Sequence, residues 1–182
     1  MTTATVSSPF VAWLQDLAER KDRGRLAALR RGLLLEPAQF YELYREVPPQ
    51  FLDGVGIAEI QRRLMVAILF ATHQGSFAPE ALEKRRRNLG ESLRMLAVKR
   101  AGGTLDPEEG LPDPLKRRLD AILAAPAEDL FFHLRQVIRL LKAEEIPVDW
   151  DQLLWDLRNW DRDDRRVQWQ WSRSFYVGER EG

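Results

Sequence analysis

Apolar residues recur at helical spacing along almost the whole chain. After Ser8 and Pro9, a capping hydroxyl and a first-turn proline, apolar residues stand at i, i+3, i+4 and i+7 between Phe10 and Leu17. No stretch of four or more residues alternates apolar and polar positions with the Val, Ile and Thr content typical of strands. The pattern therefore predicts an all-α protein.

The same spacing predicts further helices over about 25–33, 37–47, 57–70, 115–123, 130–141, 150–157 and 163–176. We expect one all-helical domain over residues 1–182 with about nine or ten helices. It forms either a compact bundle or two lobes, about 1–100 and 114–182. The Gly- and Pro-containing segment 101–113 is the predicted irregular connection between such lobes.

A run of four basic residues, Lys84–Arg87, interrupts one of the helical patterns. A continuous helix from Pro79 to Leu96 would place Arg86 in the same stripe as its leucines. An unpaired guanidinium is costly to bury. We therefore predict that the helix breaks near Asn88–Gly90, which leaves Lys84–Arg87 on a loop or a frayed helix end.

Composition narrows the class of protein. The 182 residues contain 45% hydrophobic residues, enough for a core, and no cysteine, so disulfides, thiol catalysis and cysteine-ligated metals are excluded. The first eight residues lack the basic and apolar regions of a signal peptide, and no apolar run approaches the roughly 20 residues that a membrane span needs. We expect a soluble cytoplasmic protein without membrane contact.

Charge is balanced overall but divided into blocks. The chain has 28 basic and 28 acidic residues, yet residues 84–100 carry seven basic residues against Glu91 alone, and residues 19–31 are also net basic. Residues 144–164 are strongly acidic. Such blocks either solvate or neutralise separate faces, or they form a binding surface for a charged partner.

Nothing in the sequence indicates an enzyme. The Gly-rich phosphate loops and the H-E-x-x-H motif are absent, and His73 and His133 have no partner spaced to orient them for catalysis. The acidic cluster of Asp161, Asp163 and Asp164 lacks the glycine and distal glutamate of a calcium loop, so a helix start is the better interpretation. We expect no catalysis, metal or cofactor.

Basic residues at helical spacing are the best candidates for a binding surface. Arg135, Arg139 and Lys142 stand at i, i+4 and i+7, across the helix from its leucine stripe, and such a row suits a phosphate backbone. A solvated helix face is the competing interpretation. The other candidate nucleic-acid-binding residues are Arg85, Arg86, Arg87, Arg94, Lys99, Arg100, Lys116, Arg117 and Arg118.

Aromatic residues add a second kind of candidate. Phe132 falls beside the cationic row, where it would stack on a base, pack against another subunit or, more simply, pack against a neighbouring helix. We predict that Trp150 and Trp171 belong to the core. Trp155 and Trp169 fall off the apolar stripes, and there they indicate a protein–protein contact.

Several segments resemble the CasB family, the small subunit of the subtype I-E CRISPR Cascade complex. The run RLLKAEEIPVDW over 139–150 and the run VQWQWSRSFY over 167–176 resemble the C-terminal signature of that family. Weaker matches are AALRR over 27–31 and GESLRML over 90–96.

The resemblance implies a non-catalytic helical subunit of a CRISPR-RNA-guided surveillance complex. Its expected partners are other Cascade subunits, a second copy of itself, CRISPR RNA and target DNA, chiefly the displaced strand of the R-loop. A helical scaffold that contacts only proteins is the alternative. The family's basic positions correspond to Arg31, Lys99, Lys116, Arg118, Arg135, Arg139 and Arg162. The three aspartates around Arg162 depart from the expected basic turn.

Overall fold

The computed structural model describes residues 7–105 and 110–178. Residues 1–6, on which the signal-peptide prediction falls, and the middle of the predicted 101–113 connection lie outside the described residues. The elements in chain order are α1 (Pro9–Glu19), α2 (Arg23–Arg30), the 3-10 helices η1 (Arg31–Leu34), η2 (Pro37–Glu46) and η3 (Pro49–Phe51), α3 (Ile57–Thr72), α4 (Pro79–Lys84), α5 (Leu89–Arg100), α6 (Asp113–Ala124), α7 (Ala127–Ala143), α8 (Trp150–Arg158) and α9 (Arg166–Tyr176).

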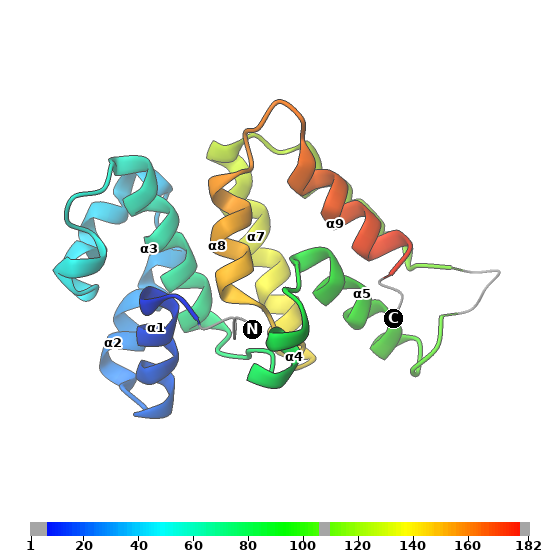
Figure 1. Ribbon diagram of the computed structural model, residues 1–182, viewed down its shortest axis with the longest axis horizontal. Coiled ribbons are helices and arrows are strands. Elements are labelled where there is room, and N and C mark those ends of the chain that lie inside the picture. The colour runs from blue at the N-terminus through cyan, green and yellow to red at the C-terminus, as the bar shows by residue number, and fades with distance from the viewer. Residues whose placement is uncertain (1–6, 106–109, 179–182) are drawn as a thin grey trace.

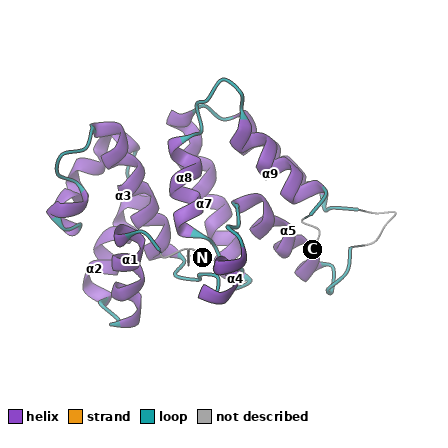
Figure 2. Cartoon of the chain, viewed as in Figure 1, coloured by secondary structure: helices purple, strands orange, loops and turns teal. Residues whose placement is uncertain are grey.

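The prediction of an all-α fold is confirmed. The described segments contain helices and loops (Figure 2), apart from one isolated β-bridge between Ser76 and Val148. None of their helices is both long and apolar enough to span a bilayer. The division into two lobes stays a prediction.

Helix α3 lies at the centre because its second half is apolar on every side. All residues from Leu64 to Thr72 are buried, and the helix packs against α2, η2, α7 and α8. Figure 1 shows α1, α2 and α3 on one side of the molecule and α5 and α9 on the other, with α7 and α8 between them. The predicted core residues Trp150 and Trp171 are both buried.

Two elements differ in detail from the predicted helices. Residues 37–46 form a 3-10 helix, in which Phe40 and Leu43 share one buried face because positions i and i+3 eclipse at three residues per turn. The last helix begins at Arg166, three residues later than predicted, because Arg165 adopts a left-handed conformation (φ 52°).

The predicted helix break before Gly90 is confirmed. α4 ends at Lys84, and the side chain of Asn88 caps the first turn of α5 by accepting a hydrogen bond from the backbone N–H of Glu91. Gly90 itself lies inside α5 at the crossing with α9, where a Cβ atom would come within 2.2 Å of the Trp171 carbonyl oxygen. The glycine therefore permits close packing of two helices.

The short segment between α7 and α8 ties distant parts of the chain together. The carbonyl of Ile146 lies 2.6 Å from His73 Nε2, and the carbonyl of Pro147 accepts from Ser92 Oγ (2.8 Å). The indole N–H of Trp150 donates to the carbonyl of Gly75 (3.1 Å). These bonds join the end of α3 and the first turns of α5 to the start of α8.

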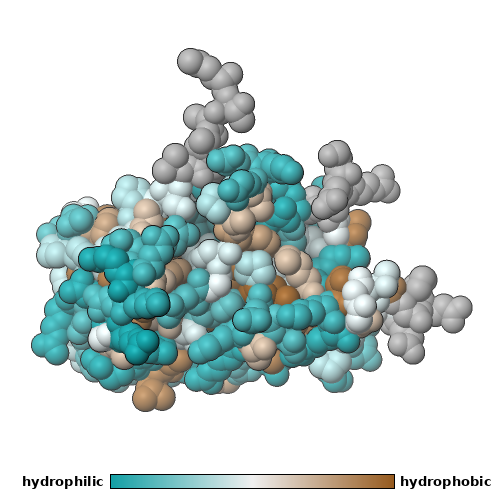
Figure 3. Space-filling view, turned by 90° about the horizontal axis from the view of Figure 1, so that it is seen from below, coloured by the Kyte–Doolittle hydropathy of each residue, from teal (hydrophilic) through white to brown (hydrophobic). Residues whose placement is uncertain are grey.

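The face shown in Figure 3 is mainly hydrophilic, with hydrophobic residues gathered in its middle and towards the right of the view. The larger apolar side chains that remain exposed are scattered, among them Leu34, Tyr41, Ile57, Phe132 and Trp169.

A carboxyl group is buried between α8 and α9. Asp156 has no exposed surface and accepts hydrogen bonds from Trp171 Nε1 (2.7 Å) and Gln152 Nε2 (2.8 Å). Burial raises the pKa of Asp156 to about 7, although both hydrogen bonds favour the charged form. The folded protein therefore holds this proton more tightly than the unfolded chain does.

Asp156 makes stability depend on pH. Because the pKa of Asp156 is raised in the folded protein, the protonated side chain stabilises the fold. This stabilisation is fully present below about pH 3.8 and is lost as the pH rises through about 7. Asp156→Asn removes this titration. We measure the free energy of unfolding of both proteins by urea denaturation between pH 5 and pH 8. Relative to the variant, the wild type should lose stability as the pH rises, by up to about 1.4 kcal/mol per pH unit. A pH-independent difference would contradict the assignment.

Candidate nucleic-acid interface

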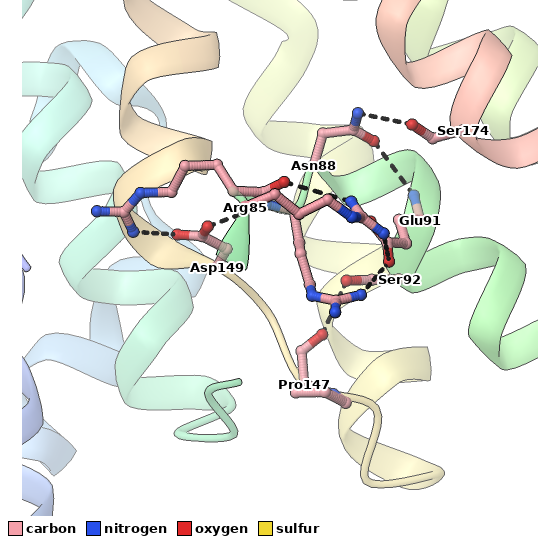
Figure 4. A network of polar contacts seen from close by, with 9 residues as sticks. Arg85, Asn88, Glu91, Ser92, Pro147, Asp149 and Ser174 are labelled. Carbon is pink, nitrogen blue, oxygen red and sulfur yellow. Dashed lines mark hydrogen bonds and ion pairs between the residues drawn. The ribbon is translucent and has the colours of Figure 1, made fainter. Parts of the chain in front are cut away.

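The arginine-rich loop between α4 and α5 is tied to a buried aspartate. Asp149 caps α8 by accepting a hydrogen bond from the backbone N–H of Gln152. Its carboxylate also accepts hydrogen bonds from Arg86 Nη1 (3.1 Å) and from the backbone N–H of Arg87 (3.1 Å). Figure 4 shows this carboxylate facing the loop. Burial raises the pKa of Asp149, and these donors oppose that shift. Arg86, predicted to contact nucleic acid, is therefore engaged inside the protein.

The other two arginines of the loop converge on one glutamate. Arg85 makes two hydrogen bonds of 2.8 Å to the carboxylate of Glu91, and Arg87 Nη1 contacts the same group. The Arg87 guanidinium also lies over the ring of Phe77, 5.1 Å from its centroid. Glu91 is buried, so this cluster neutralises a carboxylate that would otherwise be costly to bury.

The basic residues of α5 reach towards the C-terminal half, and two of them, Arg94 and Lys99, line one groove. Arg94 Nη1 donates to the carbonyl of Phe175 (2.8 Å), and Lys99 Nζ donates to that of Glu144. Arg100 lies 3.5 Å from the Glu144 carboxylate. The groove, about 470 Å³, brings together Arg85, Arg87, Arg94 and Lys99.

A second groove, about 420 Å³, runs between α6 and α7. Arg117 and Arg118 line one wall, and Phe132 and His133 line the other. Arg118 Nη1 donates to the side-chain oxygen of Gln136 (3.0 Å) across the groove. The arrangement presents guanidinium groups beside an exposed aromatic ring.

Arg135 extends this groove towards η1. Its guanidinium lies over Phe132, 4.9 Å from the ring centroid, and donates to the carbonyl of Leu33 (2.9 Å). Arg139 and Lys142 follow along α7 and are exposed, and Arg31 is exposed in the same 3-10 turn as Leu33. We define the α6–α7 surface as Arg31, Arg117, Arg118, Phe132, Arg135, Arg139 and Lys142.

The two remaining predicted residues belong to surface ion pairs. Lys116 Nζ lies 2.6 Å from Asp113, one turn away on α6. Arg162 Nη2 lies 3.1 Å from Asp164, in the aspartate-rich turn before α9.

A third groove, about 660 Å³, lies between α8 and α9, and Arg86 is the one predicted site residue that the structure places in its lining. The other arginines around it were not selected from the sequence. Arg158 and Arg173 line it together with Trp155, and Arg166 lies over the Trp155 ring at 5.3 Å. The sequence does contain one indication of a cationic surface here, because no acidic residue occurs between Arg165 and Gly178.

The described side chains include no group of three or more histidine, aspartate or glutamate residues placed to hold a metal ion. His73 is buried against Ile146, and desolvation lowers its pKa. His133 lies in the wall of the α6–α7 groove.

These features define an all-helical protein with cationic grooves between its helices. The family model described as CRISPR-associated protein Cse2 matches residues 25–176, so the chain belongs to the Cse2 family, and the resemblance to CasB is confirmed. A Cse2 protein of Thermus thermophilus is 27% identical over 92% of this chain and 88% of its own length.

Solved structures agree with this assignment. The chain matches CasB of M. ruber with a TM-score of 0.70 and 29% identity, over 94% of each chain. It also matches a chain of a CRISPR RNA-guided surveillance complex with a TM-score of 0.67 and 26% identity, over 91% of this chain and 88% of that one.

The placement of Arg86 predicts a large effect of its partner on stability. Asp149→Ala removes the acceptor of two backbone N–H groups and leaves the partly buried Arg86 with only Asp151, 3.7 Å away. We expect the free energy of unfolding to fall by about 3–5 kcal/mol in urea denaturation. Asp16→Ala, which breaks the exposed pair of Asp16 with Arg20 at the end of α1, is the matched control and costs only a small fraction of that. Equal losses in the two variants would refute the structural role of Asp149.

Proposed function

We propose that this chain is the small subunit of a Cascade-type, CRISPR RNA-guided surveillance complex. In this role it binds the nucleic acid backbone without sequence preference and stabilises the displaced strand of the R-loop. It performs no catalysis and needs no cofactor. Its partners are the other Cascade subunits, a second copy of itself, CRISPR RNA and target DNA.

Family membership supports the assembly role. The matched chain in the surveillance complex is similar over most of its length, which favours the same place for this protein. In such a complex the guide RNA reads the sequence by base pairing, so a protein subunit only needs to hold strand backbones.

The single observation that carries nucleic-acid binding is the α6–α7 surface. Arg139 and Lys142 are exposed on one helix, and Arg117 and Arg118 face Phe132 across the groove. Guanidinium groups bind phosphate through paired hydrogen bonds and stack on bases, so this combination suits a polynucleotide better than a featureless solvated face.

A scaffold that contacts only proteins is the second candidate. The internal bonds of Arg86, Arg94 and Lys99 favour it, because these residues stabilise the fold and have fewer donors left for a ligand. A scaffold of this kind would bind other subunits but no oligonucleotide at low salt.

Salt dependence tests the α6–α7 surface. Each phosphate contact contributes about −0.9 for duplex or −0.7 for single-stranded DNA to the slope of log K against log salt concentration. We expect Arg135→Ala/Arg139→Ala/Lys142→Ala to flatten the slope by about 2 to 3, measured by fluorescence anisotropy with a labelled oligonucleotide.

A charge-matched variant provides the control. Arg20→Ala/Arg23→Ala/Arg45→Ala removes three exposed arginines, one directly after α1, one in α2 and one in η2, and should leave the slope nearly unchanged. Equal flattening by both variants would show that only net charge matters. An unchanged slope in the α7 variant would rule out the α7 row.

A further inference from the structure

Cationic and aromatic side chains alternate on the exposed face of α9. Arg166, Trp169, Arg173 and Tyr176 stand at i, i+3, i+7 and i+10, and all four are exposed. The opposite face, with Val167, Trp171 and Phe175, is buried against the body of the protein. We call these four exposed residues the α9 face.

Two members of the α9 face have no partner within the described structure. Trp169 is 73% exposed, and its ring stacks on no other aromatic or cationic group of the described residues. Within the same residues, the guanidinium of Arg173 makes no hydrogen bond or ion pair. A large apolar ring and an uncompensated charge, one helical turn apart, are available for a ligand.

The groove between α8 and α9 adjoins this face and is also open. Arg173 and Gln170 line it from α9, and Trp155, which is 36% exposed, lines it from α8. The Arg166 guanidinium covers the Trp155 ring at 5.3 Å. The two other arginines that line the groove have acidic partners, Arg158 with Glu59 and Arg86 with Asp149, so the unpaired guanidinium of the groove is Arg173 on α9.

We propose that the α9 face is a second nucleic-acid site, in which bases of a single strand stack on Trp169 while Arg166 and Arg173 hold the flanking phosphates. The charge argues for a polyanion, because α9 contains no acidic residue. Alternation of rings and guanidinium groups is typical of sequence-independent single-strand binding, in which every base offers a π-face. Duplex DNA has its bases already stacked and gains nothing from Trp169.

The ends of the α9 face set the length of the site. The aspartate-rich turn, with Asp161, Asp163 and Asp164, lies just before α9 and repels a backbone there. At the other end of the α9 face, Tyr176 Oη lies 3.4 Å from the carboxylate of Asp120, and this acidic group limits the site there. Trp169 and Tyr176 are separated by about 10.5 Å along the helix, room for about three nucleotides of a stacked strand.

This site goes beyond the proposed function, because it adds an uncovered stacking ring at a separate place, whereas the Phe132 ring of the α6–α7 surface already lies under the Arg135 guanidinium. The α8–α9 groove and the α6–α7 groove share no lining residue. The α6–α7 surface mainly attracts phosphates and accepts either form of DNA, whereas the α9 face selects single strands.

Oligonucleotides with and without bases separate stacking from charge. Fluorescence anisotropy is measured with labelled dT12 and with an abasic strand of the same length, at one salt concentration. We expect the wild type to bind dT12 at least about fivefold more tightly than the abasic strand. Trp169→Ala should lower the affinity for dT12 to that for the abasic strand and leave the abasic affinity unchanged. Trp169→Phe keeps a ring and should retain most of the preference.

Tyr41→Ala, at another strongly exposed aromatic residue, is the matched control and should bind like the wild type. Circular dichroism and urea denaturation check that each variant is folded.

The Arg135/Arg139/Lys142 variant should lose affinity for both strands equally, so failure of the α6–α7 surface is distinguishable from failure of the α9 face. Wild-type affinity of Trp169→Ala for dT12 would overturn the proposal. The proposal would also be overturned if Trp169→Ala bound dT12 like the wild type but bound purified protein subunits of the complex more weakly, since Trp169 would then serve a protein contact.

Discussion

A buried negative charge at Asp149 organises the middle of the molecule. Its carboxylate must be compensated because burial penalises the charged form, and it is compensated by the start of α8 and by the loop before α5 together. The loop is thereby fixed against α8, and α5 begins where it can cross α9 at Gly90. One electrostatic requirement thus determines the break between α4 and α5 and the approach of two helices far apart in sequence.

The same requirement divides the arginines into two groups. Those of the 85–87 loop neutralise Asp149 and Glu91, so the most basic block of the sequence serves mainly the interior. On the outer sides of α7 and α9, by contrast, Arg139, Lys142 and Arg173 are exposed. A zero net charge is therefore compatible with local cationic surfaces, because many of the carboxylates form ion pairs inside the protein or with neighbouring arginines.

Hydrophobic periodicity was sufficient to predict the helices, the core tryptophans Trp150 and Trp171, and the break before Gly90, because each depends on local spacing and burial. The pairing of Arg86 with Asp149 was beyond reach, since 63 residues separate the two in sequence and only the tertiary fold brings them together. Charge counting draws attention to the 84–100 block, in which seven basic residues stand against one acid, and not to α9, whose two arginines do not form a run. The lack of any acid in α9 is nevertheless visible in the sequence.

The two proposed binding surfaces would respond differently to salt, and they would therefore contribute differently to holding a displaced strand. Phosphate contacts on the α6–α7 surface would weaken steeply with salt, because their binding releases counterions into solution. Stacking on Trp169 buries apolar surface and depends little on salt. A strand held by both surfaces would be captured through long-range attraction and retained through short-range contact. Reannealing would then have to remove bases from the α9 face before the duplex could close over them.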